Sequence, residues 1–483
     1  MDFYRPERAC DELDRRFGRC IPLCLALLVA TACGSAQDRE AGPMAAGALR
    51  GKNLLVITLD TTRRDHISAY GVPGLEGTTP AIDRLAAQGA LFENAYSQTN
   101  TTNPSHTSLF TGLYALDTRI MNNHSAFEDV AADIDTLPAA FQRAGYRTGG
   151  FAAVAHVSKQ GLALPGFDEA NVPPGELRAS QIVPVLIRWI QQDRTRPFFA
   201  WLHLFDPHIP YRPPAKYRAL YYQGDPTAGD STPLGESPSF KRSAPKPSRE
   251  QFGKVRDRRY PAAMYRGEIR FLDDQLGRLL RALEKLGLSD DTAIVLLGDH
   301  GESLGEHEIY YDHAGLYEES IRIPFIVRLP GFPAGVRVTE RVGQIDLAPT
   351  LVELFDVNLE SATPLRGLSL AEALRGKQGT ALTGRDWMIH ESASNHQIAV
   401  RRGPWKAIYS VWFMEPPVLL FDLEQDPKER HNLAKERPEL VEELRVQAQP
   451  WLDEGRWKIG TEAFEKALGE RLRALGYLPG DDD

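Results

Sequence analysis

Cysteine is scarce in this sequence. All four cysteines (Cys10, Cys20, Cys24 and Cys33) lie within the first 33 of the 483 residues. Everything after Cys33 is therefore without disulfides, thiolate metal ligands or a cysteine nucleophile. Any metal or catalytic chemistry in the body of the protein must use other side chains.

The sequence also has no excess of basic residues. The sequence has 56 Lys and Arg against 65 Asp and Glu, which gives a formal net charge of −9. Proteins that bind nucleic acids usually carry a basic face. We therefore expect no nucleic-acid partner, and any binding of anions must depend on a local site.

Long apolar runs are absent after the first 33 residues. The run over 21–32 follows Arg15, Arg16 and Arg19 and is too short to span a bilayer comfortably. It ends in Ala-Thr-Ala-Cys-Gly, which resembles the lipobox of bacterial lipoproteins, whose cysteine is lipidated after cleavage. We predict a signal peptide over 1–33 and a tether over 34–51.

The predicted protein is thus exported and held in the cell envelope by a lipid on Cys33, its only membrane contact. The first lipobox position is Ala rather than Leu. Simple cleavage after Ala32 or Ala36, giving a periplasmic or secreted protein, remains an alternative. A third interpretation is a buried apolar segment.

Short apolar runs alternate with amphipathic helical patterns. Runs over 53–59, 198–204, 293–297 and 324–329 are typical of strands buried on both faces. One helical stripe contains Ile269, Leu272, Leu276, Leu279, Leu280 and Leu283. The alternation predicts an α/β fold, in which helices sandwich a large, mixed, mostly parallel sheet. Ligands of such sheets bind beyond the carboxyl ends of the strands.

The pattern changes twice along the chain. Residues 223–248 are rich in Pro, Ser, Gly and Asp without periodicity, which predicts a flexible surface insertion or a lid. From about residue 384 the strand-like runs become shorter, at 397–401, 405–410 and 418–422. We predict a catalytic domain over 52–383 and a small antiparallel C-terminal subdomain over 384–483, closed by helices from Pro438 onward.

Polar residues stand where strands end or helices begin. Asp60 closes the first run, His208 follows the second, and Asp299 and His300 close the third. Thr102 precedes a helix predicted from Asn103 as N-cap and Pro104 as first helical residue. Taken singly, each has an ordinary interpretation as a turn, cap or surface residue.

Together these residue types allow a specific chemistry. Two carboxylates and an imidazole suit a divalent cation, which can polarise an anionic ester and activate a hydroxyl. N–H groups at a helix N-terminus favour phosphate or sulfate oxygens. This predicts attack by Thr102 on a tetrahedral anionic ester, with a covalent intermediate.

The ordered motifs resemble the sulfatase family of the alkaline-phosphatase superfamily, over about 52–434. They are NLLVITLDTTRRDHISAYG, TNPSH followed by LFTG, FDPHIPY, LLGDHGESLGEH, DHAGLYEESIRIP and FDLEQDPKERHNLA. The resemblance implies that Asp60, Asp299 and His300 are metal ligands. It gives His208 a substrate-binding or leaving-group role, and it places His313 where a catalytic lysine often stands.

Three departures from the family pattern concern the anion site. Thr102 occupies the position of the Cys or Ser that sulfatases oxidise to formylglycine, so we expect no formylglycine. His106 replaces the signature arginine. The lysine of the family's Gly-Lys-x-His segment falls on Ala153, with His156 one place out of register. Because a threonine ester needs a second in-line attack, phosphate or phosphonate esters are as plausible as sulfate esters.

The resulting hypothesis assigns a role to each residue. Asp60, Asp299 and His300 hold one divalent ion (Ca, Mg, Mn or Zn), and Thr102 completes the site and attacks. His208 and His313 bind the anion or protonate the leaving oxygen, a task suited to a near-neutral pKa. His106 supports Thr102 with a pH-sensitive positive charge, and Ser105 contacts the substrate.

Two glutamates, the substrate and the type of reaction each have more than one interpretation. Glu302 and Glu306 either orient neighbouring groups or are solvated loop charges. The expected substrate is an anionic ester of a small molecule, glycan or lipid. A phosphotransferase acting on an envelope acceptor is an alternative, as is an inactive envelope binding protein, although retention of all the metal positions argues against inactivity.

Overall fold

The computed structural model describes residues 46–452, apart from 128–129, 131–132, 160, 378, 393–395 and 411–417. The predicted signal peptide, the lipobox and most of the tether lie outside the described residues. Among the described helices, none is both long and apolar enough to cross a membrane.

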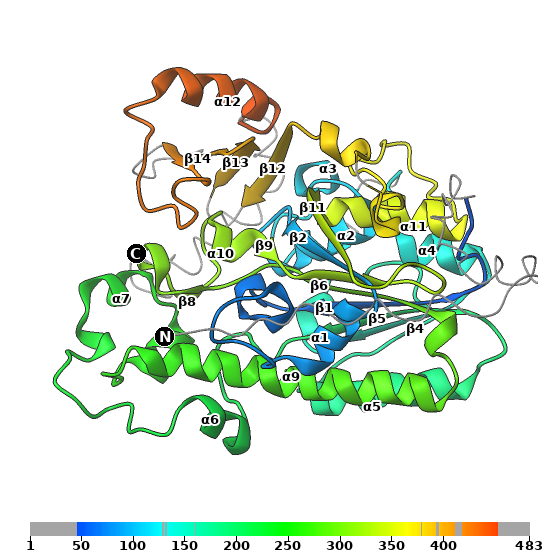
Figure 1. Ribbon diagram of the computed structural model, residues 1–483, viewed down its shortest axis with the longest axis horizontal. Helices are drawn as coiled ribbons and strands as arrows, with labels where there is room; N and C mark the ends of the chain where they lie inside the picture. Colours follow the sequence, from blue (N-terminus) through cyan, green and yellow to red (C-terminus); the bar gives the residue numbers. More distant parts are fainter. Residues whose placement is uncertain are drawn as a thin grey trace, which may run out of the picture. The chain divides into compact units, whose positions relative to one another are not determined.

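A nine-stranded sheet forms the centre of the molecule (Figure 1). Its order is β11-β2-β10-β6-β1-β5-β3-β4, with β9 beside β2. The neighbours from β6 to β4 are parallel, whereas β10 is antiparallel to both β6 and β2. The strands are β1 (Asn53–Leu59), β2 (Ala90–Tyr96), β3 (Arg147–Ala152), β4 (Glu169–Ala170), β5 (Phe198–Leu204), β6 (Thr292–Gly298), β9 (Arg322–Ile323), β10 (Phe325–Arg328) and β11 (Val336–Gly343).

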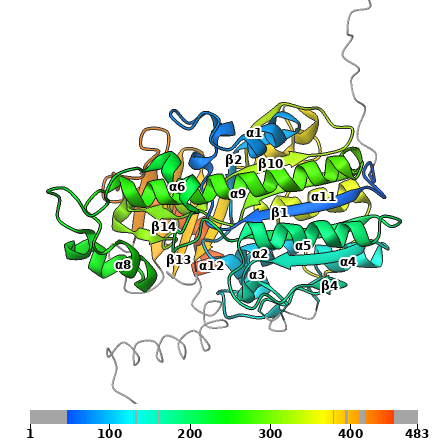
Figure 2. The same ribbon diagram turned by 90° about the horizontal axis from the view of Figure 1, so that it is seen from below.

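Helices cover both faces of this sheet, as predicted. Figures 1 and 2 show α9 and α5 along one face and α2, α4 and α11 along the other. Helix α9 contains the predicted apolar stripe, most of which is buried. The helices are α1 (Pro80–Ala87), α2 (Thr102–Thr111), α3 (Ala115–Thr118), α4 (Leu137–Arg143), α5 (Ala179–Gln192), α6 (Ala215–Tyr221), α9 (Arg259–Lys285), α10 (Glu318–Ile321) and α11 (Leu347–Phe355).

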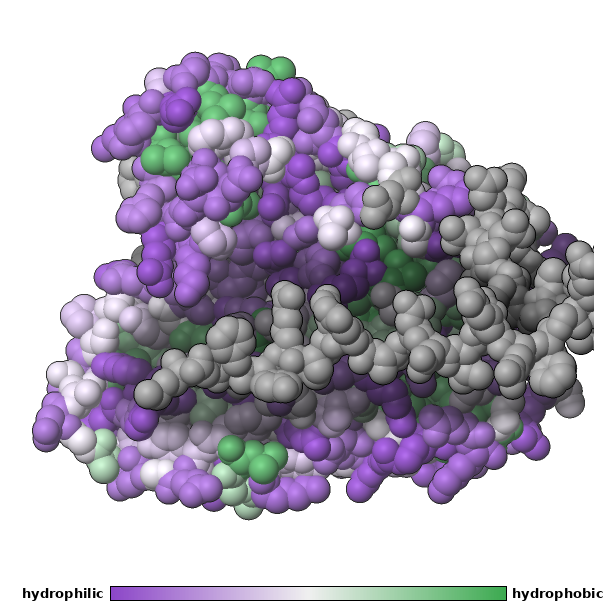
Figure 3. Space-filling model, in the orientation of Figure 1, coloured by the Kyte–Doolittle hydropathy of each residue, from purple (hydrophilic) through white to green (hydrophobic). Residues whose placement is uncertain are grey.

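A second, four-stranded antiparallel sheet follows near the C-terminus. It contains β12 (Trp387–Ser392), β13 (Gln397–Arg402), β14 (Trp405–Ser410) and β15 (Val418–Asp422), in that order. Helix α12 (Pro438–Leu452) packs on it, with buried Leu444 and Ala448 against apolar residues of β13 and β14. The α/β architecture and the small antiparallel sheet are confirmed. In the orientation of Figure 1, the described surface is mostly hydrophilic (Figure 3).

The segment 223–248 differs from the prediction of a flexible insertion. It contains the 3₁₀ turn η5 (Leu234–Glu236), helix α7 (Pro238–Ser243) and the start of α8 (Lys246–Phe252). Prolines in the first turns of α7 and α8 favour helix starts rather than irregular chain. Phe240 is fully buried, and its ring lies 5.4 Å from that of Tyr310, next to the β7 (Ser303–Leu304) and β8 (Tyr310–Asp312) hairpin. The lid hypothesis stays a prediction.

Candidate active site

Strand register brings the predicted metal ligands together. Leu59 of β1 pairs with Gly298 of β6 on one side and with Leu204 of β5 on the other. Asp60 and Asp299 therefore leave the sheet side by side at the carboxyl edge. Ligand atoms of Asp60, Asp299 and His300 all lie within 4.8 Å of one another. All three residues are fully buried.

Thr102 is the first residue of α2, and this corrects the predicted start of the helix. Thr101 is the N-cap with extended backbone angles, two residues before the predicted cap Asn103. The Asn103 N–H donates to Asn123 Oδ1 at 2.9 Å, and Pro104 has no N–H. The helix N-terminus therefore offers fewer donors to an anion than the sequence suggested.

The two carboxylates each keep one oxygen without a hydrogen bond. Asp299 Oδ1 accepts the N–H groups of Thr61 and His300 at 3.2 and 2.8 Å, but Asp299 Oδ2 has no partner among the described residues. The same is true of Asp60 Oδ1. Burial raises the pKa of both groups well above the ordinary value, and Asp60 raises the pKa of Asp299 further.

A divalent cation fits these groups. His300 Nδ1 lies 3.0 Å from the carbonyl oxygen of Gly301, to which it must donate, so Nε2 keeps its lone pair. That nitrogen is 3.3 Å from Thr102 Oγ1 and 3.6 Å from Asp299 Oδ2. Buried carboxylate oxygens without partners are costly unless a cation or proton neutralises them. The oxygen and nitrogen donors present suit such an ion.

His106 does not carry the predicted positive charge. It is fully buried, Nδ1 donates to the carbonyl oxygen of Thr102 at 2.8 Å, and Nε2 lies 2.9 Å from Thr58 Oγ1. Burial lowers its pKa well below the ordinary value, and nearby His203 lowers it further. A neutral imidazole therefore ties the first turn of α2 to strand β1.

Ser105 is also engaged inside the protein. Its hydroxyl lies 2.7 Å from the carbonyl oxygen of Asp299 and 2.9 Å from Gln344 Oε1. These contacts hold the backbone of a predicted metal ligand, and they favour a structural role over the predicted contact with substrate.

His208 and His313 approach the same edge from two loops. The ring centroids of His313 and His300 are 4.5 Å apart, and those of His313 and His208 are 6.1 Å apart. His208 stacks on Phe205 at 4.3 Å, and burial lowers its pKa to about 3. This lowered pKa disfavours His208 as the group that protonates the leaving oxygen, and both rings are half-buried beside the site.

Comparison with known proteins identifies the family. The family model described as Sulfatase matches residues 52–357, and the model for the N-sulphoglucosamine sulphohydrolase C-terminal region matches residues 305–452. The chain belongs to the sulfatase family. The resemblance seen in the sequence is thereby confirmed at the level of the family.

Individual relatives within the family are distant. Choline-sulfatase of Rhizobium meliloti is 26% identical over 464 residues, covering 83% of this chain and 88% of the relative. The phosphonate monoester hydrolase structure from Agrobacterium radiobacter matches with a TM-score of 0.65 and 23% identity, covering 87% of this chain and 96% of that one. A structure solved with D-glucosamine-2-N,6-O-disulfate as its substrate matches with a TM-score of 0.65 and 21% identity, covering 84% and 99%.

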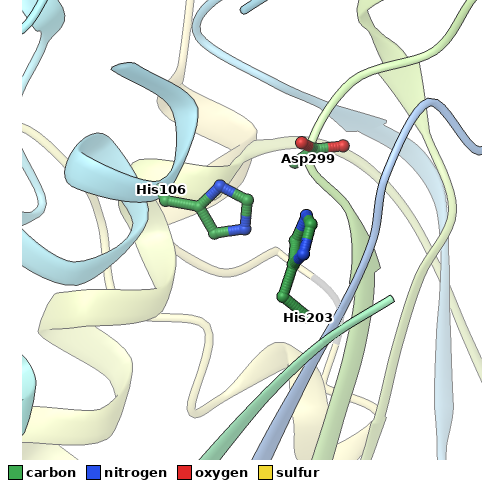
Figure 4. A group of neighbouring side chains, drawn as sticks. All are labelled: His106, His203 and Asp299. Carbon is green, nitrogen blue, oxygen red and sulfur yellow. The ribbon is translucent and has the colours of Figure 1, made fainter. Parts of the chain in front are cut away.

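This sulfatase-family site contains two histidines to which the sequence assigned no role. His203 lies near the end of β5, and its Nε2 is 3.1 Å from Asp60 Oδ2. Figure 4 shows its ring below Asp299 and beside His106, and the ligand atoms of these three residues lie within 4.8 Å of one another. His156 stands 6.3 Å from the Phe205 ring, with a buried Nε2 that has no partner among the described residues.

A sequence signal for His203 did exist. It is the only polar residue in the apolar run FFAWLHL, and a histidine inside a buried strand needs a hydrogen-bond partner. Position alone could not tell which neighbour supplies that partner.

Glu302 and Glu306 support the loop after His300 rather than the carboxylates themselves. Glu302 is fully buried and accepts the hydroxyl of Tyr211. Glu306 accepts Arg63 Nη1 at 2.8 Å, and the same guanidinium donates to the carbonyl oxygen of Glu302 at 3.2 Å. These bonds hold the 302–306 loop against the segment that follows Asp60.

Proposed function

We propose that the protein is a metal-dependent hydrolase of sulfate or phosphate esters, with Thr102 as the nucleophile. The observation that carries the proposal is the position of Thr102 Oγ1. It lies 3.3 Å from the free nitrogen of His300, at the same edge as the two unsatisfied carboxylate oxygens. Membership of the sulfatase family supports the ester chemistry.

Asp60, Asp299 and His300 would hold one divalent ion, of the Ca, Mg, Mn or Zn type. When bound, such an ion supplies positive charge that stabilises the ester oxygens and the Thr102 oxygen. Burial of the ligands excludes water from their side of the site. His203 fixes the carboxylate of Asp60 through Asp60 Oδ2 and leaves Asp60 Oδ1 for the ion.

The proposed reaction has two in-line steps. Thr102 Oγ1 attacks the sulfur or phosphorus atom, the bond to the leaving oxygen breaks, and the Thr102 proton passes to solvent. The leaving oxygen takes a proton from His313 or from water. Water then attacks the sulfur or phosphorus atom of the threonine ester, the bond to Thr102 Oγ1 breaks, and Thr102 regains a proton as the sulfate, phosphonate or phosphate product leaves. This route needs no formylglycine.

The site favours a singly charged ester. Among the described residues, neither lysine nor arginine hydrogen-bonds to Thr102, Asp299 or His300. A single divalent ion facing two carboxylates leaves little positive charge for a dianion. Sulfate monoesters, phosphonate monoesters and phosphate diesters therefore fit better than phosphate monoesters. Related proteins include a choline-sulfatase and a phosphonate monoester hydrolase.

A phosphotransferase is the second candidate function. The covalent threonine ester would serve it equally, with an acceptor hydroxyl replacing water in the second step. The Ala-Thr-Ala-Cys-Gly segment supports export and lipid attachment at Cys33, which would place glycan or lipid acceptors nearby. An inactive binding protein is disfavoured because all the metal-binding side chains still converge.

The test compares four chromogenic esters with the purified full chain loaded with Mn²⁺ or Zn²⁺. They are an aryl sulfate, an aryl phosphate monoester, a phosphate diester and a phosphonate monoester. We expect turnover of at least one singly charged ester, a loss of about a thousandfold or more in Thr102→Ala, and partial retention in Thr102→Ser. Unchanged turnover in Thr102→Ala would refute the nucleophile, and preference for the phosphate monoester would refute the charge argument.

A further inference from the structure

A cavity of about 760 Å³ lies apart from the proposed catalytic site. It is enclosed by the 3₁₀ turn η1 (Arg64–His66), helix α9, helix α10 and the loop over 427–430 of the C-terminal subdomain. None of Asp60, Thr102, Asp299 and His300 lines it. Its volume is within the range of about 300–1,000 Å³ that is usual for small-molecule sites.

Three of the four acidic residues of the wall pair with arginine or lysine. Arg63 pairs with Asp65 at 2.7 Å and with Glu306 at 2.8 Å. Glu318 pairs with Lys406 at 3.2 Å and with Arg401 at 3.3 Å, both from the C-terminal sheet. The fourth, Glu319, accepts the hydroxyl of Ser303 at 3.1 Å and lies 3.5 Å from His307 Nε2. Among the described residues, none of these carboxylates is within ion-pair distance of the remaining cations of the cavity.

Those remaining cations come from three separate segments. Arg322 begins β9, Arg266 projects from α9, and Lys428 and Arg430 belong to the loop after β15. Across the described residues, no carboxylate lies within ion-pair distance of any of these four. Arg64 of η1 also lines the cavity and pairs with Glu93 at 3.0 Å.

Two guanidinium groups of the wall have donors to spare, and one imidazole has a nitrogen without a partner. The Nε atoms of Arg64 and Arg322 and the Nδ1 atom of His66 are buried without hydrogen-bond partners in the described structure. His66 is only 8% exposed. Burial lowers the pKa of Arg64, and the neighbouring Arg322 lowers it further. Two like charges that share a partly buried wall repel each other, and an anion between them would remove that repulsion.

We propose that this cavity binds a small organic polyanion that carries sulfate or phosphate groups. Guanidinium groups match the geometry of tetrahedral oxyanions. One such anion does not fill the space, and the cations occur both at the interior (Arg64, Arg322) and at the exposed rim (Arg266, Lys428, Arg430). The ligand therefore carries at least two anionic groups. The inference does not rest on the proposed ester hydrolysis.

The test measures binding of sucrose octasulfate and inositol hexakisphosphate to the full chain by isothermal titration calorimetry. Thr102→Ala serves as the background, so that turnover does not interfere. We expect Arg266→Ala combined with Arg430→Ala to weaken binding of at least one probe by tenfold or more. Arg430→Lys should retain most of the affinity. The matched control is Arg218→Ala, which removes an exposed arginine of α6 outside the cavity.

The outcomes separate this site from the catalytic one. Inorganic sulfate and phosphate, titrated alone, should bind at least tenfold more weakly than the better polyanion. Turnover of a small aryl ester, measured with Thr102 intact, should be the same with and without the double substitution. Absence of polyanion binding, equal binding by the double variant, or an equal loss in Arg218→Ala would each overturn the proposal.

Discussion

His203 donates to Asp60 from inside the sheet. Its Nε2 is 3.1 Å from Asp60 Oδ2, and both side chains are fully buried. A hydrogen bond of this kind orients a carboxylate ligand, and its loss typically lowers metal affinity by about 10–100-fold. The imidazole is therefore a positioning residue rather than a ligand of the proposed ion.

We predict that His203→Ala weakens binding of Mn²⁺ or Zn²⁺ by about tenfold or more, and that His203→Gln, which still offers an N–H donor, recovers part of the loss. Competition with a chromogenic chelator measures the affinity. The control is His390→Ala. His390 lies in β12 of the C-terminal sheet and is equally buried, but its Nδ1 bonds to the carbonyl oxygen of Ser97. If His203→Ala and the control bind metal alike, His203 does not position Asp60.

The positions of single residues explain why some site residues could be identified from the sequence and others could not. Asp60, Asp299 and His300 end apolar runs, so their convergence follows from the common edge of parallel strands. His106 lies one helical turn after Thr102, and no sequence pattern indicates that both its nitrogens find partners inside the protein. Burial of that ring decides its charge, and only packing decides burial.

At the scale of elements, strand β12 joins the C-terminal sheet to the large domain. Glu391 of β12 pairs with Thr99 through its backbone in an isolated β-bridge, and its carboxylate accepts the N–H of Ala115 at 2.7 Å. It is almost fully buried, and no ion pair to it is present among the described residues. Burial and the charge of Asp117 raise the pKa of Glu391 to about 8.

This raised pKa predicts how the free energy of unfolding depends on pH. The folded state binds the Glu391 proton more tightly than the unfolded state, so this contribution is complete below about pH 4.5. It is lost as pH rises to about 8, at up to ~1.4 kcal/mol per pH unit. We expect Glu391→Gln to remove that slope and to be more stable than the original protein at pH 8.

Urea unfolding at pH 5, 6.5 and 8 measures the effect. Glu424→Gln is the control, since Glu424 is exposed in the same subdomain. A pH slope that is identical in the original protein and in Glu391→Gln would contradict the prediction.

Helix α2 and the 223–248 segment show what local sequence rules leave open. Asn103 and Pro104 are good start signals, yet the helix begins two residues earlier, at Thr102, after an extended Thr101. The composition of 223–248 indicated irregular chain, whereas in the structure Phe240 and Phe252 anchor short helices on Tyr310 and Tyr311. In both places contacts with distant residues prevail over local preference.

At the scale of the whole molecule, the proposed ion connects separate segments of the chain. Asp60 follows β1, whereas Asp299 and His300 follow β6. In the absence of a cation the two buried carboxylates raise each other's free energy, so an ion that binds the folded state should stabilise the entire domain.

We predict that chelation with EDTA lowers the melting temperature by several degrees and that Mn²⁺ or Zn²⁺ restores it. Binding at a hundred times the dissociation constant is worth about 2.7 kcal/mol. Asp60→Asn is the control, and its melting temperature should respond little to EDTA. An EDTA effect of equal size in that variant would place the ion elsewhere, and no effect in the original protein would argue against a resident metal.

The sequence by itself determined the α/β class, the family and the three candidate metal ligands. These depend on apolar runs and on residues at strand ends, which are local patterns with one structural solution. Only the tertiary structure decided that His106 is neutral, that His203 supports Asp60, and that cations of four segments share one cavity. Charge state and hydrogen bonding depend on burial and on neighbours far away in sequence, and those exist only after the chain has folded.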